Sequence, residues 1–302
     1  MIDKRVAIGA LARNCDENLP SNIERIEELR SRFSKSIVFI YENNSTDSTK
    51  SILVEWSSKS KGVYVKSEDI DETLYKSSNK IGRLYRGTEI GRIKKMCDCR
   101  NKLLDMIRHK GPFDYVIFID IDIAWFSIDG VVTAVENAPE GWGGLFANCF
   151  CTYNNGGNNV VRSAYYDTFA FLNKNRRPEG MKLYDLNKYK RYKLSYHITK
   201  GIRNHNFFEC ESAFGGIGIY EGKIIEGLIY ETFIPSSWKS NAICPCEHIF
   251  FNSKIKSPKF ISKDLEVCYN VYRLSKGKWM LLRVFPNVYY FLVLLKGVLS
   301  TH

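Results

Sequence analysis

Several signatures of common cofactor-binding proteins are missing from this 302-residue chain. It contains neither a Gly-x-Gly-x-x-Gly fingerprint nor a Walker loop, so the dinucleotide-binding and P-loop classes lose support. Zinc sites favour roughly two to four residues between cysteines. Six of the nine cysteines instead form pairs with one intervening residue: Cys97/Cys99, Cys149/Cys151 and Cys244/Cys246. We therefore expect free thiols in a reducing compartment rather than a zinc ribbon.

The charge balance is strongly basic. Forty-four Lys and Arg stand against 33 Asp and Glu, which gives a net charge of +11. Such an excess indicates an anionic partner: nucleic acid, nucleotide phosphates or an acidic membrane surface. The 44% hydrophobic content supports a packed core. The length fits one large α/β domain with a C-terminal appendage.

The first 65 residues predict alternating strands and helices. The chain enters an apolar strand at 6–11 directly after Met1–Arg5, so no signal peptide or N-terminal anchor is expected. Ser21 and Glu24 fit a capping box that opens a helix, and apolar residues follow at helical spacing: Ile23, Ile26, Leu29 and Phe33. A second strand at 36–41 implies a parallel, right-handed unit.

A run of strand-forming residues at 115–119 ends in two carboxylates, Asp120 and Asp122. Ligands of α/β sheets bind at the carboxyl ends of such strands. Two hard oxygen donors at that edge suit Mg²⁺ or Mn²⁺ carried with substrate phosphates. The alternative is a turn acid followed by a helix cap.

The strand at 36–41 ends in a loop of short polar side chains, followed by a helix over about 48–56. Glu42 and Asp47 are candidate nucleotide contacts, because acidic residues at strand ends accept hydrogen bonds from base or ribose hydroxyls in dinucleotide folds. The same residues also suit a turn and an N-cap. A long helix at about 88–108 then carries Arg100, which either faces solvent or binds a diphosphate with its guanidinium fork.

The second half contains three further groups of interest. Asp167 is either paired with an arginine or in contact with an acceptor hydroxyl. Gly215 and Gly216 precede a strand and let backbone approach a ligand closely, with Glu211 just before them. His248 is a structural residue or a ligand.

Two basic segments have open interpretations. Residues 174–203 carry ten Lys or Arg with interleaved tyrosines, and this composition suits a solvated loop, single-stranded nucleic acid, an anionic membrane or a pyrophosphate-linked lipid acceptor. Their place between two site motifs favours a lid on the acceptor side. The tail at 276–302 is apolar with basic flanks but too short and interrupted to span a bilayer. It suits an interfacial helix, or a helix docked on the core or on a second copy.

Three motifs in order carry a resemblance to a known family. They are Tyr41–Asp47 after a strand, Arg100–Leu104 in a helix, and a strand ending Asp120-Ile121-Asp122. Together they resemble the nucleotide-sugar half of GT-A glycosyltransferases. Residues 5–262 are most similar to the cryptococcal capsule-associated α-mannosyltransferase group and its bacterial and viral relatives, whose later motifs are similar to 165–170 and 212–216.

The resemblance implies a GT-A-like, Rossmann-like α/β fold with a mixed, mainly parallel sheet flanked by helices and an amphipathic helical tail. Residues 1–265 would form the catalytic domain, with a nucleotide-sugar half (about 1–125) and an acceptor half (about 126–265). Residues 266–302 would form a tail that binds membrane or docks on the core.

The resemblance also implies roles for individual residues. Glu42, Asn44 and Asp47 would hold the nucleotide, Arg100 the base or diphosphate, and Asp120 the ribose or metal. Asp122 would bind the metal directly, with His248 as third ligand. Gly215 and Gly216 would approach the donor. The candidate catalytic acids are Asp167, Glu211 and Glu247.

The sequence thus predicts a Mn²⁺- or Mg²⁺-dependent transferase. It would move a hexose from GDP-mannose or a UDP-hexose to a hydroxyl of a glycan or lipid-linked glycan, with retention expected from the resemblance. We expect a cytoplasmic protein peripheral to an anionic membrane, with nucleic acid an unlikely partner. The alternatives are a nucleotidyltransferase of similar fold and a non-enzymatic nucleic-acid-binding protein.

Overall fold

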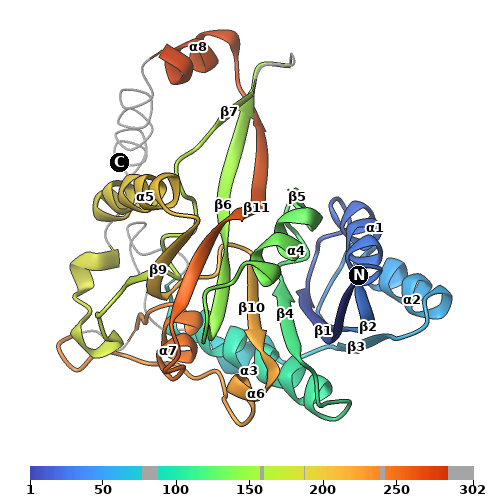
Figure 1. Cartoon of the computed structure of the whole chain (residues 1–302). Coiled ribbons are helices and arrows are strands. Elements are labelled where there is room, and N and C mark those ends of the chain that lie inside the picture. Colours follow the sequence, from blue (N-terminus) through green and yellow to red (C-terminus); the bar gives the residue numbers. More distant parts are fainter. Residues whose placement is uncertain (77–87, 157–159, 187, 239–241, 285–302) are drawn as a thin grey trace.

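The computed structural model describes residues 1–302 except 77–87, 157–159, 187, 239–241 and 285–302. Its described strands join into one mixed sheet flanked by helices (Figure 1). Along the sheet the strands follow the order β3-β2-β1-β4-β10-β6-β11-β9-β8. This architecture confirms the predicted α/β fold class.

The N-terminal half is the parallel part of the sheet. The strands β1 (Ile2–Ala12), β2 (Phe33–Asn43), β3 (Val63–Glu68) and β4 (Tyr115–Ile119) all run in one direction. They are connected through α1 (Leu19–Arg30), α2 (Thr49–Lys59), the 3₁₀ turn η1 (Glu72–Tyr75) and α3 (Ile90–Arg108). The predicted parallel unit of two strands around a helix is confirmed.

Two details of the predicted first helix are wrong. The helix α1 begins at Leu19 after Asn18, and the Ser21 hydroxyl donates to the Asn18 carbonyl instead of capping the helix. Phe33, expected on the helix, is the first residue of β2. The Pro20 ring explains the earlier start, because proline is well suited to the first turn of a helix.

The second half adds strands that run in both directions. The strand β10 (Ile217–Glu221) is antiparallel to both β4 and β6 (Gly144–Asn154), while β6 is parallel to β11 (Lys259–Arg273). The sheet continues with β9 (Phe207–Ser212) and β8 (Leu172–Asn173), and the short strands β5 (Trp125–Phe126) and β7 (Val160–Arg162) pair with β11 and β6.

The remaining helices cover this second half. The helix α4 (Ile128–Glu136) packs on β11, α5 (Lys188–Asn204) on β9 and β11, α6 (Gly222–Ile225) on β10, and α7 (Glu247–Ser253) on β9. Two 3₁₀ turns, η3 (Pro178–Gly180) and η4 (Leu183–Leu186), precede α5. The basic segment 174–203 is therefore largely helical.

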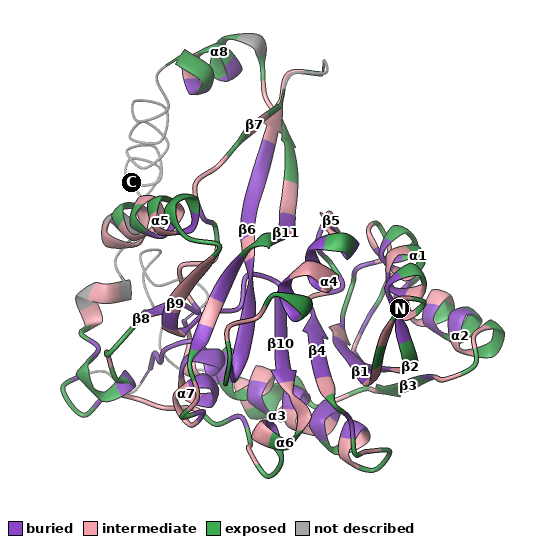
Figure 2. Ribbon diagram, viewed as in Figure 1, coloured by how far each residue is buried: buried purple, intermediate pink, exposed green. Residues whose placement is uncertain are grey.

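The core lies on both faces of the central strands, which Figure 2 shows as a buried band. Residues 116–119 of β4 are all buried. Such a continuous apolar run is typical of a strand covered on both faces. It explains why the chain can carry Asp120 and Asp122 only after this strand ends, at the rim of the sheet.

The C-terminal region begins inside the sheet. The strand β11 continues to Arg273, past residue 265, and α8 (Lys276–Val284) follows it. The division between a catalytic domain and a tail stays a prediction, and its part at 285–302 lies outside the described residues. Within the described residues, no helix has both the length and the apolar character needed to cross a membrane.

The close approach of α4 to β11 gives a test of the fold. A Cβ added at Gly130 would lie 2.0 Å from the carbonyl oxygen of Asp264. Replacing Gly130 with alanine should destabilise the protein by about 1–3 kcal/mol through overpacking, despite a helix-propensity gain of about 1 kcal/mol. The measurement is the urea midpoint of unfolding.

The control is Gly180→Ala, because no atom lies within 4 Å of a Cβ added there. It should change stability by less than about 0.5 kcal/mol. Equal midpoints for the two variants would contradict this packing of α4 on the sheet.

Candidate active site

A cavity of about 390 Å³ opens at the carboxyl ends of β1 and β4. Its lining includes Asp120 and Asp122 after β4, Arg100 from α3, and Glu247 and His248 at the start of α7. Asp167 also lines it. The structure thus brings together six of the predicted site residues from four distant stretches of the chain.

An ion pair lies at the base of this cavity. The Arg100 guanidinium donates from Nε to Glu247 Oε1 at 3.0 Å, and its Nη2 lies 3.7 Å from Asp120 Oδ1. The side chains of Arg100 and Glu247 are only 6% and 5% exposed. Burial alone would raise the pKa of Glu247, but the adjacent guanidinium outweighs it and lowers that pKa to about 2. Glu247 is therefore an ionised partner of Arg100.

Aromatic rings enclose the arginine. Its guanidinium carbon lies 5.2 Å from the ring centre of Phe214 and 5.6 Å from that of Tyr230. A cation over an aromatic face is stabilised by the ring quadrupole. Arg100 is thus a buried structural cation beside the acidic pair, and of its two predicted interpretations the solvent-facing one is wrong.

Burial opposes ionisation of both carboxylates of the Asp-x-Asp motif. Burial raises the pKa of Asp120 to about 8, and Asp122, Asp167 and Glu247 add to the shift against the opposing charge of Arg100. Burial also raises the pKa of Asp122. A bound cation would remove this cost, because an opposite charge nearby favours the ionised carboxylates.

Two asparagines, one just before α1 and one within it, hold the acidic turn in place. Asn22 Nδ2 donates to the carbonyls of Ile121 and Ile123 at 2.9 and 2.7 Å, and Asn18 Nδ2 donates to the carbonyl of Asp122 at 2.8 Å. On the other side, the Asp120 amide donates to the Gly216 carbonyl at 2.8 Å. The position of the two carboxylates therefore depends on α1 and on the Gly215–Gly216 turn.

His248 is buried at the cavity wall. Its ring stacks on Phe214 with centres 3.9 Å apart, and neither ring nitrogen has a hydrogen-bond partner among the described residues. Burial and the Arg100 charge lower the pKa of His248 well below its usual range. The imidazole is therefore neutral, which is the form that binds metals.

The donor chemistry of the acidic pair fits a divalent cation. Asp120 and Asp122 supply hard oxygen ligands, and burial raises the pKa of each despite the nearby charge of Arg100. In the described part of the chain, however, no three His, Cys, Asp or Glu side chains group as a metal site. His248 therefore does not form such a group with Asp120 and Asp122. Its role as the third metal ligand stays a prediction.

Asp167 is held by backbone donors. Its Oδ2 accepts from the Gly215 amide at 3.0 Å and its Oδ1 from the Ala170 amide at 3.3 Å. Burial raises the pKa of Asp167, against the effect of these hydrogen bonds. Gly215 needs to be glycine, because its φ is +67° and a Cβ would lie 2.5 Å from the Ala147 carbonyl oxygen. Gly216 also has a positive φ, +88°, which favours glycine.

The three predicted nucleotide contacts at the end of β2 and in the loop after it do not line this cavity. Glu42 is fully buried, accepts from the Ser45 amide at 2.8 Å and bonds the Ser67 hydroxyl. Asn44 exchanges hydrogen bonds with the Ile70 backbone. Asp47 accepts from the Thr49 amide at the start of α2. The turn-and-cap interpretation describes these contacts, and the nucleotide roles stay predictions.

The predicted acid Glu211 also lies apart from the cavity lining. Its Oε1 is 3.5 Å from the ammonium nitrogen of the buried Lys259. The structure shows Glu211 as the counter-charge of this lysine within the β9–β11 pairing. This arrangement does not test the predicted catalytic role of Glu211.

The sequence interpretation missed several residues that line the cavity. Arg13 from the loop after β1, and Arg92 and Lys95 from α3, bring positive charge to its rim. Tyr269 of β11 is also part of the wall, and the Asp120 carboxylate together with burial raises its pKa well above the usual range. The helical spacing of Arg92, Lys95 and Arg100 was the available signal.

A comparison with protein families identifies the family of this chain. The family model described as "Cryptococcal mannosyltransferase 1" matches residues 5–257. The chain belongs to this family. The predicted resemblance is confirmed, and so is the prediction of an enzyme of the glycosyltransferase class at the level of the family.

One solved structure supports the fold of this family member, and two others are less similar. GalNAc-T7 with UDP, GalNAc and Mn²⁺ is 11% identical with a TM-score of 0.51, covering 90% of this chain and 44% of that one. PcManGT from Pyrobaculum calidifontis, in complex with GDP-Man and Mn²⁺, is 14% identical with a TM-score of 0.45 and 94% and 61% coverage. TarS 1–349 from S. aureus is 13% identical with a TM-score of 0.46 and 89% and 60% coverage. The chain spans 44%, 61% and 60% of these three structures, respectively.

The buried ion pair gives a test of the site's architecture. Replacing Arg100 with methionine would leave Glu247 charged and unpaired, and this should cost about 3–5 kcal/mol of stability. Adding Glu247→Met should recover much of that loss, because two apolar side chains of similar volume often replace a buried pair without cost. Urea unfolding of both variants measures the difference.

Arg32→Met is the matched control, because Arg32 pairs with exposed Glu28 and Asp129. Surface pairs of this kind contribute about 0–1 kcal/mol. If Arg100→Met were as mild as the Arg32 variant, or if the double variant were no more stable than the single one, the buried pair would not be the organising contact described.

Proposed function

We propose that the protein is a metal-dependent glycosyltransferase that moves a hexose from a nucleotide sugar to a hydroxyl of a glycan. The observation that carries this proposal is the Asp120–Asp122 pair, held at the end of β4 inside a cavity whose rim carries Arg13, Arg92 and Lys95. A metal-bound diphosphate requires carboxylates that bind the metal ion and, beside them, basic side chains that bind the phosphates.

The positive rim residues have spare donors for the diphosphate. Arg13 and Lys95 both contact Glu72, at 2.7 and 2.6 Å. An arginine has five N–H donors and a lysine three, so each keeps donors for phosphate oxygens. In the cavity, Asp120 and Asp122 would hold a divalent cation that neutralises the charge of the departing nucleoside diphosphate. The remaining ligands would be phosphate oxygens and water.

The transfer exchanges one carbon–oxygen bond for another. The bond from the anomeric carbon to the diphosphate oxygen breaks and a bond to the acceptor oxygen forms, through an oxocarbenium-like state. The acceptor hydroxyl loses its proton to a carboxylate or to the leaving diphosphate. Asp167, fixed by two backbone amides, would accept a hydrogen bond from that hydroxyl. Retention of configuration remains the expectation from the family resemblance.

The family description and one structural neighbour narrow the donor and the metal. A mannosyltransferase family makes GDP-mannose the first donor to test. The GalNAc-T7 structure, with its similar fold, contains UDP, GalNAc and Mn²⁺. We therefore propose Mn²⁺ or Mg²⁺ as cofactor, and a UDP-hexose as the second donor to test.

A lipid-linked acceptor and an anionic membrane surface remain part of the proposal. The helix α5 presents exposed basic side chains, among them Lys193, Lys200 and Arg203. Basic residues near an anionic leaflet each contribute about 1 kcal/mol of attraction. The nucleic-acid alternative is less well supported, because Tyr192 and Tyr196 of the same helix line a cavity instead of a strand-tracking surface.

Nucleotide binding tests this function. Titration of GDP and UDP by calorimetry should show binding of one nucleotide that weakens at least about tenfold when Mn²⁺ is omitted, a change of about 1.4 kcal/mol. Asp122→Ala should lose this metal dependence, because the cation would lose a ligand. Asp129→Ala is the control, since the Asp129 side chain is 84% exposed on α4.

Binding of neither nucleotide to the wild type would contradict the donor assignment. Equal metal-dependent binding by wild type and Asp122→Ala would contradict the role of the acidic pair and leave the donor class standing.

A further inference from the structure

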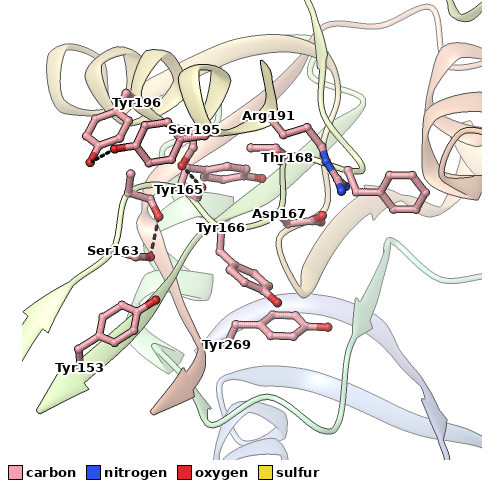
Figure 3. A pocket seen from close by; sticks show the side chains of 13 residues that line it. Tyr153, Ser163, Tyr165, Tyr166, Asp167, Thr168, Arg191, Ser195, Tyr196 and Tyr269 are labelled. Atoms are coloured by element: carbon pink, nitrogen blue, oxygen red, sulfur yellow. Dashed lines mark hydrogen bonds between the residues drawn. The ribbon is translucent and has the colours of Figure 1, made fainter. Parts of the chain in front are cut away.

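A second cavity lies directly beside the first. Its volume is about 580 Å³, within the range of roughly 300–1,000 Å³ that is typical of small-molecule sites. Figure 3 shows its walls: the end of β6, the loop before β8, α5, and Tyr269 of β11. None of the roles assigned above uses the main part of this space.

The two cavities share part of their lining. Tyr166, Asp167, Phe169 and Tyr269 line both of them. The rings of Tyr166 and Tyr269 lie 4.7 Å apart, centre to centre, and appear side by side in Figure 3. A molecule in the second cavity would therefore reach the first one beside Asp167.

The residues suited to the donor's phosphates line the first cavity and not the second. Arg13, Arg92 and Lys95, which carry the positive charge for a diphosphate, line the first cavity and do not line the second. Asp120 and Asp122 also line only the first. The second cavity is therefore placed for the molecule that receives the sugar, beyond the reacting end of the donor.

The walls of the second cavity are rich in tyrosine. Its lining includes Tyr153, Tyr165, Tyr166, Tyr192, Tyr196 and Tyr269. A tyrosine offers an apolar ring face and a hydroxyl at its edge. A pyranose needs both features, because its C–H faces are apolar and its rim carries hydroxyls. Ser163 and Thr168 add further hydroxyls.

The helix α5 supplies one wall through its periodicity. Arg191, Tyr192, Ser195 and Tyr196 all line the cavity. Positions separated by four residues share a face of a helix, so the 191/195 and 192/196 pairs form one surface. Lys193, His197 and Lys200 are exposed. The helix thus has an inner face, with Tyr192 and Tyr196 at the cavity, and an outer face that carries the exposed lysines.

Arg191 adds a donor group to this wall. Its guanidinium carbon lies 5.7 Å from the ring centre of Phe169. Figure 3 shows its side chain reaching into the space near Asp167. Five N–H donors at this place suit the oxygens of a saccharide.

We propose that this tyrosine-lined cavity is the acceptor subsite and binds a hexopyranoside. Its ring would lie against Tyr196 and Tyr166, and its reacting hydroxyl would point past Asp167 to the donor. This assignment rests on the proposed transferase function and adds the class of the acceptor to it. Tyr196 is the residue to test, because it lines the second cavity and not the first.

Ligand-observed saturation-transfer NMR with the full chain tests the assignment. The probes are the para-nitrophenyl α- and β-glycosides of mannose, glucose and galactose. At least one should show saturation of its ring C–H protons, with a Kd about three- to tenfold weaker for Tyr196→Ala, the size expected for loss of an aromatic contact. GDP or UDP binding with Mn²⁺ should change less than about twofold.

Two further variants separate stacking from folding. Tyr196→Phe keeps the ring and loses only the hydroxyl contact of 3.3 Å with Tyr192, so it should retain most of the affinity. Lys200→Ala lies on the exposed face of the same helix and should behave as the wild type.

The outcomes separate the two proposals. Wild-type protein that binds a nucleotide but none of the glycosides would overturn the acceptor subsite and leave the transferase function standing. Glycoside binding that is equal in wild type and Tyr196→Ala would also overturn it. Glycoside binding lost in Tyr196→Ala, in protein that binds neither nucleotide, would support a saccharide cavity and contradict the donor assignment.

Discussion

The ion pair between Arg100 and Glu247 is the contact on which the rest of the site depends. It joins α3 to the start of α7, two segments separated by 147 positions in the chain. Two charges removed from water are costly unless each satisfies the other. The same guanidinium lies 3.7 Å from Asp120 and beside Phe214 and Tyr230. One side chain therefore fixes the relative positions of the sheet edge, the turn before β10 and α7.

This arrangement pairs one carboxylate of the cavity with Arg100 and leaves three others near it. Arg100 is matched by Glu247, and the carboxylates of Asp120, Asp122 and Asp167 remain, each with its pKa raised first by burial. A site in that condition favours a cation, and the hard oxygen donors favour a small divalent one. A metal-bound diphosphate would use both the basic side chains at the rim and the carboxylates at the centre of the cavity.

Local sequence patterns were enough to find the parts of the site that are close together in the chain. The apolar strand before Asp120 and Asp122, the helix around Arg100, and the Gly215–Gly216 turn all show their structure in a few adjacent residues. The residues at the end of β2 and in the loop after it were harder to assign from the sequence. Glu42, Asn44 and Asp47 have side chains suited to a ligand, but the backbone of their own loops and caps takes up the contacts that the structure shows.

The remaining parts depend on which segments the fold brings together. Tyr269 lies in β11, and no local pattern shows that this strand passes Asp120. The pairing of Arg100 with Glu247 is equally invisible in the sequence. The segment at 174–203 had the right composition for several partners, and only the position of α5 beside β9 and β11 shows that some of its tyrosines face inward.

The central claim is that Asp120 and Asp122 hold a divalent cation against a nucleoside diphosphate. A crystal structure of the protein grown with Mn²⁺ and GDP or UDP, with anomalous data collected for manganese, tests it most directly. The account predicts an anomalous peak in contact with the Asp122 carboxylate and with the diphosphate of the bound nucleotide. A nucleotide bound in the cavity with no manganese at Asp122, or manganese bound elsewhere with the diphosphate, would contradict it.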